Sequence, residues 1–99
     1  MKRIISPKIT RSARGQDCTL QIPGHCNYNP ETTVAAHMNF DGGKMGGKTH
    51  DISVAYACSG CHSALDAHLV AEDERYYYMA RGLVRTLAKL IEQGVIKCG

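Results

Sequence analysis

The stretch that decides the fold is CSGCHSALD, residues 58–66. It contains a Cys-x-x-Cys pair, Cys58 and Cys61, with His62 directly after it and Asp66 four residues further on. In an intracellular chain this spacing is typical of half a zinc site or of a thiol redox motif. The remaining cysteines decide between the two.

A second cysteine pair lies upstream, at Cys18 and Cys26. The residues between them include Pro23 and Gly24, which favour a turn, and the alternating run 19–22 predicts a short strand before it. The two pairs together supply the four thiolates of a tetrahedral site, so we expect structural Zn2+ bound by all four cysteines. His25 could replace one of them. A redox role for the downstream pair leaves the upstream pair unexplained, and disulfides are uncommon in a reducing compartment.

The composition indicates why a metal matters to this chain. It has 99 residues, the size of a single domain, with one Phe, no Trp and ten Gly. A core with so few large side chains gives marginal stability, which zinc binding would raise by about 10 kcal/mol. The fifth cysteine, Cys98, is predicted to be a spare thiol. No apolar run is long enough for a signal peptide or a membrane span, so we expect a cytoplasmic protein with no membrane partner.

Charge is distributed unevenly along the chain. Residues 1–15 carry five basic residues and no acidic one, residues 16–75 carry three basic and eight acidic, and residues 76–99 carry four basic and one acidic. We expect residues 1–11 to form a basic, extended arm, since Pro7 disfavours helix, and residues 12–99 to form one domain. A basic arm suits binding to a polyanion, although ordinary solvated charge explains it as well. The predicted nucleic-acid-binding residues are Arg11 and Arg14, with Lys44 and Lys48 of the glycine-rich loop 41–48, which could equally be a surface loop without a ligand.

The apolar pattern predicts a β-hairpin followed by helices. Residues 32–38 form the first strand, with His37 at its end, and residues 52–57 form the second. Helical spacing begins at Cys61 and places His62 and Asp66 on one face, with Leu65 and Leu69 facing inward.

A final helix is predicted from Asp73, as its N-cap, to Gly94, as its stop. Its buried stripe should be Tyr76, Ala80, Leu83, Leu87, Leu90 and Ile91. Three basic residues lie along one edge of the helix and could contact phosphates or form a solvated face: Arg81, Arg85 and Lys89.

This order of motifs resembles the HNH, or ββα-metal (His-Me finger), endonucleases of the zinc-stabilised kind. More narrowly, the segments 12–18, 29–33 and 56–62 together with Ala36-His37 are similar to the prophage-encoded YbcO family of nucleases. The resemblance covers residues 10–95 and implies an α+β fold, a small zinc-stabilised ββα-metal domain with a basic arm and a C-terminal packing helix. A related arrangement in the phage recombination-enhancement nuclease Ref implies DNA as the substrate.

Phosphodiester hydrolysis needs a base that deprotonates water and a divalent cation that neutralises developing charge. We assign His37 as the general base, and His62 with Asp66 as ligands of a catalytic Mg2+ or Mn2+, or of a second Zn2+. Many HNH members have a metal ligand before the base, whereas this chain has Ala36 there. Asp51 could supply an orienting group or a further ligand. The alternatives are a hydrogen-bonded core histidine for His37, a neighbour of the zinc site without a catalytic metal for His62, and a helix-dipole contact for Asp66.

Two functions therefore remain open from the sequence. The first is a metal-dependent DNA endonuclease or nickase acting in phage recombination or DNA processing, with a recombinase filament as a candidate partner. The second is a non-catalytic, zinc-stabilised nucleic-acid-binding module. The sequence leaves the oligomeric state undetermined.

Overall fold

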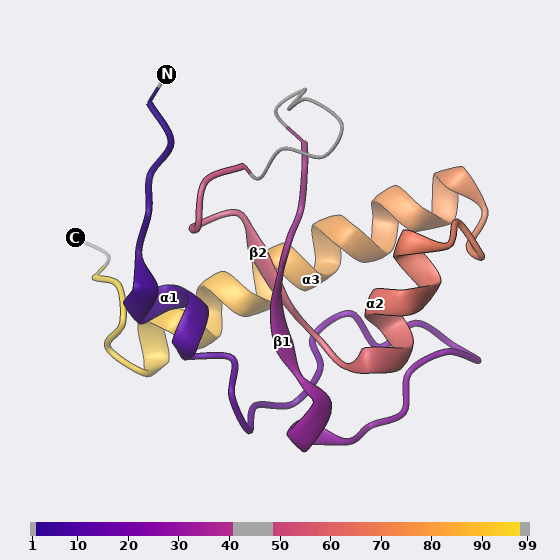
Figure 1. The fold of residues 1–99 in the computed structure, drawn as a ribbon, viewed down its shortest axis with the longest axis horizontal. Helices are drawn as coiled ribbons and strands as arrows, with labels where there is room; N and C mark the ends of the chain where they lie inside the picture. The colour runs from indigo at the N-terminus through magenta and orange to yellow at the C-terminus, as the bar shows by residue number, and fades with distance from the viewer. Residues whose placement is uncertain (1, 41–48, 98–99) are drawn as a thin grey trace.

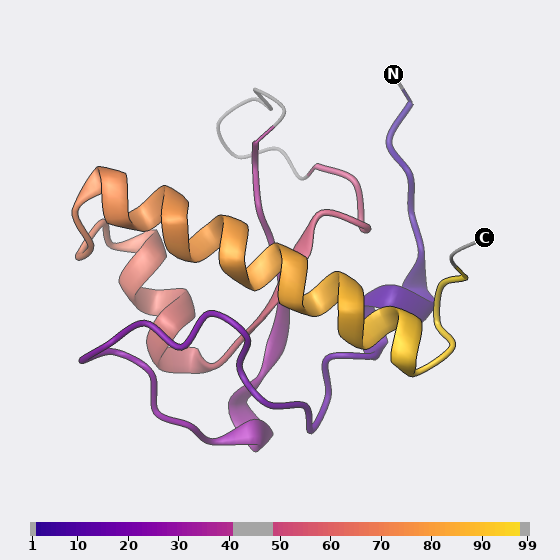
Figure 2. The same ribbon diagram turned by 180° about the vertical axis from the view of Figure 1, so that it is seen from behind.

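The computed structural model describes residues 2–40 and 49–97. It contains a two-stranded antiparallel sheet, three α-helices and one 3-10 turn, in the order α1 (Pro7–Arg11), η1 (Pro30–Thr32), β1 (Val34–His37), β2 (Val54–Ala57), α2 (Ser59–Asp66) and α3 (Glu72–Glu92). The predicted α+β class is confirmed. Figures 1 and 2 show α3 running along one side of the hairpin, with α1 at one flank of the strands and α2 at the other. None of the described helices is both long enough and apolar enough to span a bilayer.

The predicted hairpin forms, in the register Val34 with Ala57 to His37 with Val54. Just past the ladder, the backbone N–H of Met38 donates to the Ser53 carbonyl oxygen at 2.7 Å. All four residues of β2 are buried and divide by strand alternation between two core clusters: Ala55 and Ala57 in one, Val54 and Tyr56 in the other. His37 therefore lies at the end of a strand whose partner is fully enclosed.

The predicted strand over 19–22 does not form. The N–H of Thr19 donates to the Tyr56 carbonyl at 2.8 Å, but Gln21 then adopts a positive φ of 46° and turns the chain away from β2. The N–H of Tyr56 meets two hydroxyls, of Thr19 and of Thr86 on α3, each at 3.0 Å. Side chains thus satisfy the free edge of β2, which removes the need for a third strand.

The prediction of an extended arm is wrong for residues 7–11, which form α1. Pro7 is the first helical residue, where its missing N–H costs nothing, and the Ser6 hydroxyl accepts from the N–H of Ile9 at 3.3 Å as an N-cap. Ile9 is buried in the same cluster as Tyr56. The segment is therefore attached to the core through α1.

The long helix α3 packs on β2 through a face that differs from the predicted one. Its buried residues are Met79, Gly82, Thr86 and Leu90. Of the predicted stripe, Tyr76 and Ile91 are 47% and 43% exposed. The buried face is rotated by about a quarter of a turn from the predicted one, taking 3.6 residues per turn. The predicted N-cap is also wrong, because Ala71 precedes the helix and Asp73 lies in its first turn.

Two small residues explain why α3 buries this face and not the predicted one. A Cβ on Gly82 would lie 2.6 Å from Leu20 Cδ2 and 3.1 Å from Ala55 Cβ, so glycine is what allows the helix to approach the sheet this closely. Thr86 places its hydroxyl 2.9 Å from that of Thr19. The helix ends at Glu92, and Gly94, the predicted stop, follows the C-cap residue Gln93 with a positive φ of 72°.

We expect Gly82→Ala to destabilise the protein by about 1–3 kcal/mol, because the added methyl overpacks the contact with Leu20 and Ala55. The expected change in the free energy of unfolding is opposite in sign to the usual one, since Gly→Ala inside an exposed helix normally stabilises by about 1 kcal/mol. Urea unfolding of the two proteins measures the difference. Equal or greater stability of the variant would show that α3 does not pack on the sheet through this residue.

Candidate functional site

Four cysteine sulfurs meet where the 18–26 segment packs against the start of α2. The Sγ atoms of Cys18, Cys26, Cys58 and Cys61 all lie within 4.8 Å of one another, and those of Cys26 and Cys58 are 3.7 Å apart. Tetrahedral zinc with Zn–S bonds of 2.3 Å separates its sulfurs by about 3.8 Å. Three of the cysteines are buried and Cys26 is half-buried. The cluster is therefore shaped to hold a metal ion such as zinc.

Backbone N–H groups surround these sulfurs. Gln21 N–H donates to Cys18, Ile22 N–H to Cys61, and those of Asn27 and Cys61 both donate to Cys58, at 3.4–3.5 Å. Such donors stabilise thiolates. The turn at 23–25 also approaches α2 so closely that a Cβ on Gly60 would overlap the carbonyl oxygen of His25. The predicted turn is confirmed. A glycine is required at position 60 because a larger residue would push the turn away from α2 and separate the four cysteines.

The pKa values of neighbouring thiols shift in opposite directions. The hydrogen bond with Cys61 lowers the pKa of Cys18 to about 4. The same hydrogen bond, and to a lesser extent burial, raises the pKa of Cys61. Burial raises the pKa of Cys26 to about 11. A cation at the centre of the cluster is what would allow all four thiols to ionise together.

The second element of the site is a pair formed by His37 and Asp51. The Nε2 atom of His37 lies 2.8 Å from Asp51 Oδ1, across the described part of the hairpin connection. The Asp51 side chain is 4% exposed and that of His37 is 14% exposed. The histidine ring therefore meets solvent over a small area and is oriented from behind by a buried carboxylate.

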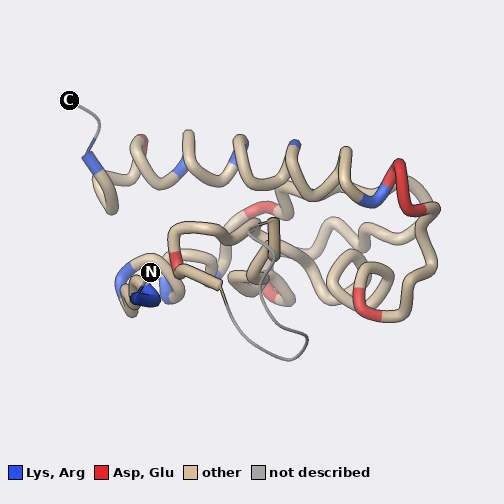
Figure 3. The backbone as a smooth tube through the Cα atoms, turned by 90° about the horizontal axis from the view of Figure 1, so that it is seen from above, with Lys and Arg blue, Asp and Glu red and all other residues tan. Residues whose placement is uncertain are grey.

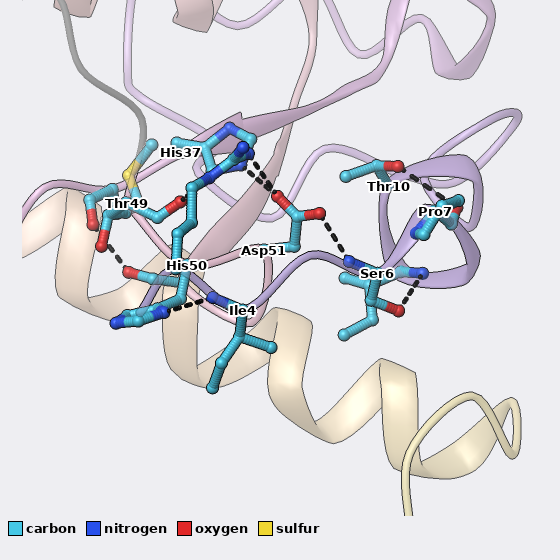
Figure 4. Close-up of polar contacts among 12 residues, drawn as sticks. Ile4, Ser6, Pro7, Thr10, His37, Thr49, His50 and Asp51 are labelled. Carbon is cyan, nitrogen blue, oxygen red and sulfur yellow. Dashed lines mark hydrogen bonds and ion pairs between the residues drawn. The ribbon is translucent and has the colours of Figure 1, made fainter. Parts of the chain in front are cut away.

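The N-terminal segment holds Asp51 in place (Figure 4). The Arg3 guanidinium donates to Asp51 Oδ1 at 3.0 Å, and the backbone N–H of Ser6 donates to Oδ2 at 2.7 Å. Ile4 adds two further bonds, accepting from Asp51 N–H and donating from its own N–H to His50 Nδ1. Both oxygens of Asp51 thus receive donors from the protein. Of its two predicted roles, these contacts favour an orienting group over a metal ligand.

These contacts also set the ionisation of Asp51. Burial acts to raise its pKa, but the hydrogen bond with His37, the Ser6 N–H and the charge of Arg3 together lower it. The carboxylate is therefore ionised at neutral pH and can only accept a hydrogen bond, which places a proton on Nε2 of His37, and in the neutral imidazole this is the Nε2–H tautomer. That tautomer leaves the lone pair on Nδ1, where a base would take a proton.

His62 and Asp66 lie on one face of α2, as predicted, with Nε2 and Oδ2 3.5 Å apart and side chains 43% and 73% exposed. Leu65 is buried, but Leu69 is 63% exposed, because the helix ends at Asp66 and leaves Leu69 in the following turn. Among the described residues, the cysteine cluster is the group of at least three His, Cys, Asp or Glu side chains placed to share one ion. His62 and Asp66 could hold a cation with most of its coordination positions open.

One open cleft of about 920 Å3 connects the pair His37 and Asp51 with the pair His62 and Asp66. His37, Asp51, His62 and Asp66 all line it, as do Arg3 and Arg11. A smaller cavity beside it, about 150 Å3, shares His37, His62 and Asp66 with the cleft. The structure thus brings the predicted base and the predicted cation ligands to the same solvent-filled space.

The predicted nucleic-acid-binding residues divide into two groups. Arg11 lines the cleft and also a second groove, which runs past β1 to Arg14. Lys44 and Lys48 lie outside the described residues, as does the predicted spare thiol Cys98. On α3, Arg81 donates to the carbonyl oxygens of Leu20 and Gln21, so this part of the predicted basic edge supports the metal centre.

Sequence reasoning missed three residues of the site. Arg3 and Ser6 were assigned only to an arm, and Asn39, two residues after His37, lines both the cleft and the smaller cavity. The alternation of β1 could have indicated Asn39, since residues two apart on a strand face the same side. Nothing local indicates Arg3, which lies 48 positions from Asp51 in the chain.

Comparison with known proteins gives evidence about the family of this chain that is independent of the geometry of the site. Residues 7–95 match the family model described as "Putative nuclease YbcO". The proteins of that name from Escherichia coli K12 and from Enterobacteria phage 82 are each 38% identical over 92 residues, covering 90% of this chain and 96% of theirs. A solved structure of a bacteriophage protein from E. coli K-12 is similar, with a TM-score of 0.73 and 37% identity over 86% of this chain and 98% of that one.

For the cysteine cluster, we expect one zinc ion per chain and loss of the helical circular dichroism signal when a strong chelator removes it. The reason is that metal binding contributes about 10 kcal/mol to the folding of such small domains. Cys58→Ser should lower zinc content and stability together, whereas Cys98→Ser, the matched control, should change neither. A metal-free protein that keeps its helical signal and its unfolding midpoint would contradict this role.

For the histidine pair, we expect 15N NMR of neutral His37 to show the proton on Nε2. Asp51→Ala should abolish that preference and lower the free energy of unfolding by about 1–3 kcal/mol, because it leaves the Ser6 N–H and Arg3 without their acceptor. Asp66→Ala is the control, since this exposed carboxylate does not contact His37. Unchanged nitrogen shifts in Asp51→Ala would show that Asp51 does not orient the ring.

Proposed function

This chain belongs to the YbcO family of nucleases, and from that premise we propose that it is a metal-dependent endonuclease or nickase that hydrolyses DNA phosphodiester bonds. The observation that carries the proposal is the position of His37, which is oriented by an ionised carboxylate and faces the cleft that His62 and Asp66 also line. Phosphodiester hydrolysis uses both parts of this combination, a base and a cation site. A protein that merely binds nucleic acid needs neither a base nor a cation site.

His37 is the proposed general base. With Nε2–H bonded to Asp51, its Nδ1 takes the proton of the attacking water, and the carboxylate 2.8 Å away stabilises the imidazolium that forms. Arg3 and the N–H of Ser6 keep that carboxylate in place during the transfer. These groups act as positioning residues because they touch Asp51 and not the water.

His62 and Asp66 are the proposed ligands of the catalytic cation, Mg2+ or Mn2+, with Zn2+ as a further candidate. The cation would neutralise charge on the phosphorane and on the leaving oxygen. An imidazole and a carboxylate fit this task, since Mg2+ sites of nucleases use few protein ligands and complete their coordination with water and phosphate. Ala36 supplies no ligand, and the contacts of Asp51 leave it committed to the protein.

The charge pattern supports DNA as the substrate. Figure 3 shows the basic residues of the N-terminal segment and of α1 gathered at one end of the molecule. Two of them, Arg3 and Arg11, line the cleft. Arg11 lines both the cleft and the groove that continues to Arg14, which gives a basic path leading to His37. The order β1, β2, α2, with His37 on the first strand and the cation ligands on the helix, is the arrangement expected of a ββα-metal domain. One relative comes from a phage. A role in phage recombination or DNA processing, with a recombinase filament as a candidate partner, is our further proposal and rests on the resemblance to the phage recombination-enhancement nuclease.

We expect the zinc-loaded protein to nick supercoiled plasmid in Mg2+ or Mn2+, and His37→Ala to lower the rate by about 100-fold to 10,000-fold, the usual range for a lost general base. His62→Ala should reduce cleavage and weaken its dependence on the added cation. His68→Asn is the matched control, because His68 is exposed, lies outside the cleft and has a positive φ of 54° that Asn tolerates.

Folding must be equal for the comparison to count, so zinc content and helical signal are measured for each protein. If neither the wild type nor the variants cleave the plasmid but all of them shift DNA in a gel, the alternative function, a zinc-stabilised binding module, replaces the nuclease. Cleavage by His37→Ala at the wild-type rate would remove His37 as the base.

A further inference from the structure

The outward face of α3 carries five apolar residues spaced symmetrically about Val84. They are Tyr77, Ala80, Val84, Ala88 and Ile91, which are three, four, four and three positions apart. Tyr77, Val84 and Ile91 are 61%, 66% and 43% exposed, and both alanines are exposed. We call these five residues the outer stripe. Figure 2 shows α3 crossing the front of that view, with no other described segment over it.

The face that α3 buries lies nearly opposite the outer stripe, so Ala80 and Ile91, which the sequence predicts to be buried, are exposed beside Val84. The sheet takes the face that contains Gly82 and Thr86, which permit close approach and a buried hydrogen bond. A second set of large apolar side chains is then left in solvent. The Arg81 guanidinium lies 5.6 Å from the centre of the Tyr77 ring, yet that side chain stays mostly exposed. An exposed helix rarely displays aligned Tyr, Val and Ile without a partner.

We propose that the outer stripe binds a second copy of this chain, with the two α3 helices antiparallel about a two-fold axis at Val84. A two-fold contact requires a surface that is complementary to itself, and this spacing reads the same in both directions. Tyr77 then packs against Ile91 of the partner subunit, Ala80 against the partner's Ala88, and Val84 against the partner's Val84. The alanines let the helices approach closely over about 21 Å, at 1.5 Å per residue.

Charge favours the antiparallel direction. The first turn of α3 carries Glu72, Asp73 and Glu74, followed by Arg75, a net charge of −2. The far half and the residues after it carry Arg85, Lys89 and Lys97 against Glu92, a net charge of +2. Figure 3 shows the acidic cluster at one end of this helix, with a further acidic residue among basic ones toward the other end. Antiparallel pairing brings the acidic end of each helix to the basic end of the other, while parallel pairing would bring like charges together.

This contact leaves the candidate active sites open. The cleft is lined by the N-terminal segment, β1 and α2, and α3 covers the other side of the hairpin (Figures 1 and 2). A dimer would therefore present two clefts, the number that a cut through both strands requires. The contact itself does not depend on the proposed nuclease activity.

Sedimentation velocity of the zinc-loaded full chain tests the proposal. We expect the mass to rise toward twice that of the monomer between about 10 and 500 µM, the range for a modest interface. Val84→Glu should raise the dissociation constant at least about tenfold, because it places two carboxylates together at the two-fold axis. Leu69→Glu is the control: Leu69 is 63% exposed but lies off the stripe, so this variant should dimerise like the wild type.

A charge pair tests the antiparallel register. Ala80→Glu should weaken the dimer, and the double variant Ala80→Glu/Ala88→Lys should restore it, since each glutamate then faces a lysine of the partner subunit. Circular dichroism and zinc content show that each variant is folded. A wild type that stays monomeric at the highest concentration overturns the proposal, as does a Val84→Glu variant that dimerises as tightly as the wild type. A double variant no tighter than Ala80→Glu overturns the register.

Discussion

The meeting of four cysteine sulfurs connects the parts of this chain that matter for its site. Cys18 and Cys26 lie on an irregular segment with few hydrogen bonds of its own, while Cys58 and Cys61 begin α2. The Cys58 sulfur also accepts the N–H of Cys61 and so caps that helix. Because His62 follows Cys61 directly, whatever holds the sulfurs together also sets the direction of the proposed cation ligands. A small chain with a sparse core depends on such a cross-link.

The proposed chemistry depends on a second constraint, the burial of Asp51. A carboxylate that is 4% exposed must have its oxygens paired, and here the donors come from His37, Arg3 and Ser6. These contacts offset the cost of burying Asp51, keep its carboxylate ionised and orient the ring of His37. The N-terminal segment is thus part of the site, although its distance in sequence from the hairpin hides this. Its basic character has a structural use as well as any role in binding a polyanion.

The helix α3 shows how packing can override apolarity. Its largest apolar side chains predict one buried face, but the sheet selects another, where Gly82 allows close contact and Thr86 satisfies the edge of β2. The close contact at Gly82, together with the hydrogen bonds of the buried Thr86 hydroxyl to Thr19 and to the N–H of Tyr56, outweighs the burial of a few more methyl groups. Two apolar residues of the predicted buried face, Ala80 and Ile91, are left in solvent and form part of the proposed contact between two subunits.

The sequence by itself determined the features that depend on local order. The spacing of the cysteines indicated one cluster, the strand-length runs indicated the hairpin with His37 at the end of β1, and the four-residue interval placed His62 and Asp66 on one helical face. The helix begun by Pro7 also has local signals, the Ser6 cap and Pro7 at its first position, which the predicted extended arm overlooked. Tertiary structure alone decided the rest: the bend at Gln21 in place of a strand, the bonds from Arg3 and Ser6 to Asp51, and the face that α3 buries. The physical reason is the separation along the chain of the residues that interact. Periodicity and capping act between residues a turn apart, whereas these features arise from contacts between residues 30 to 67 positions apart, which no local pattern encodes.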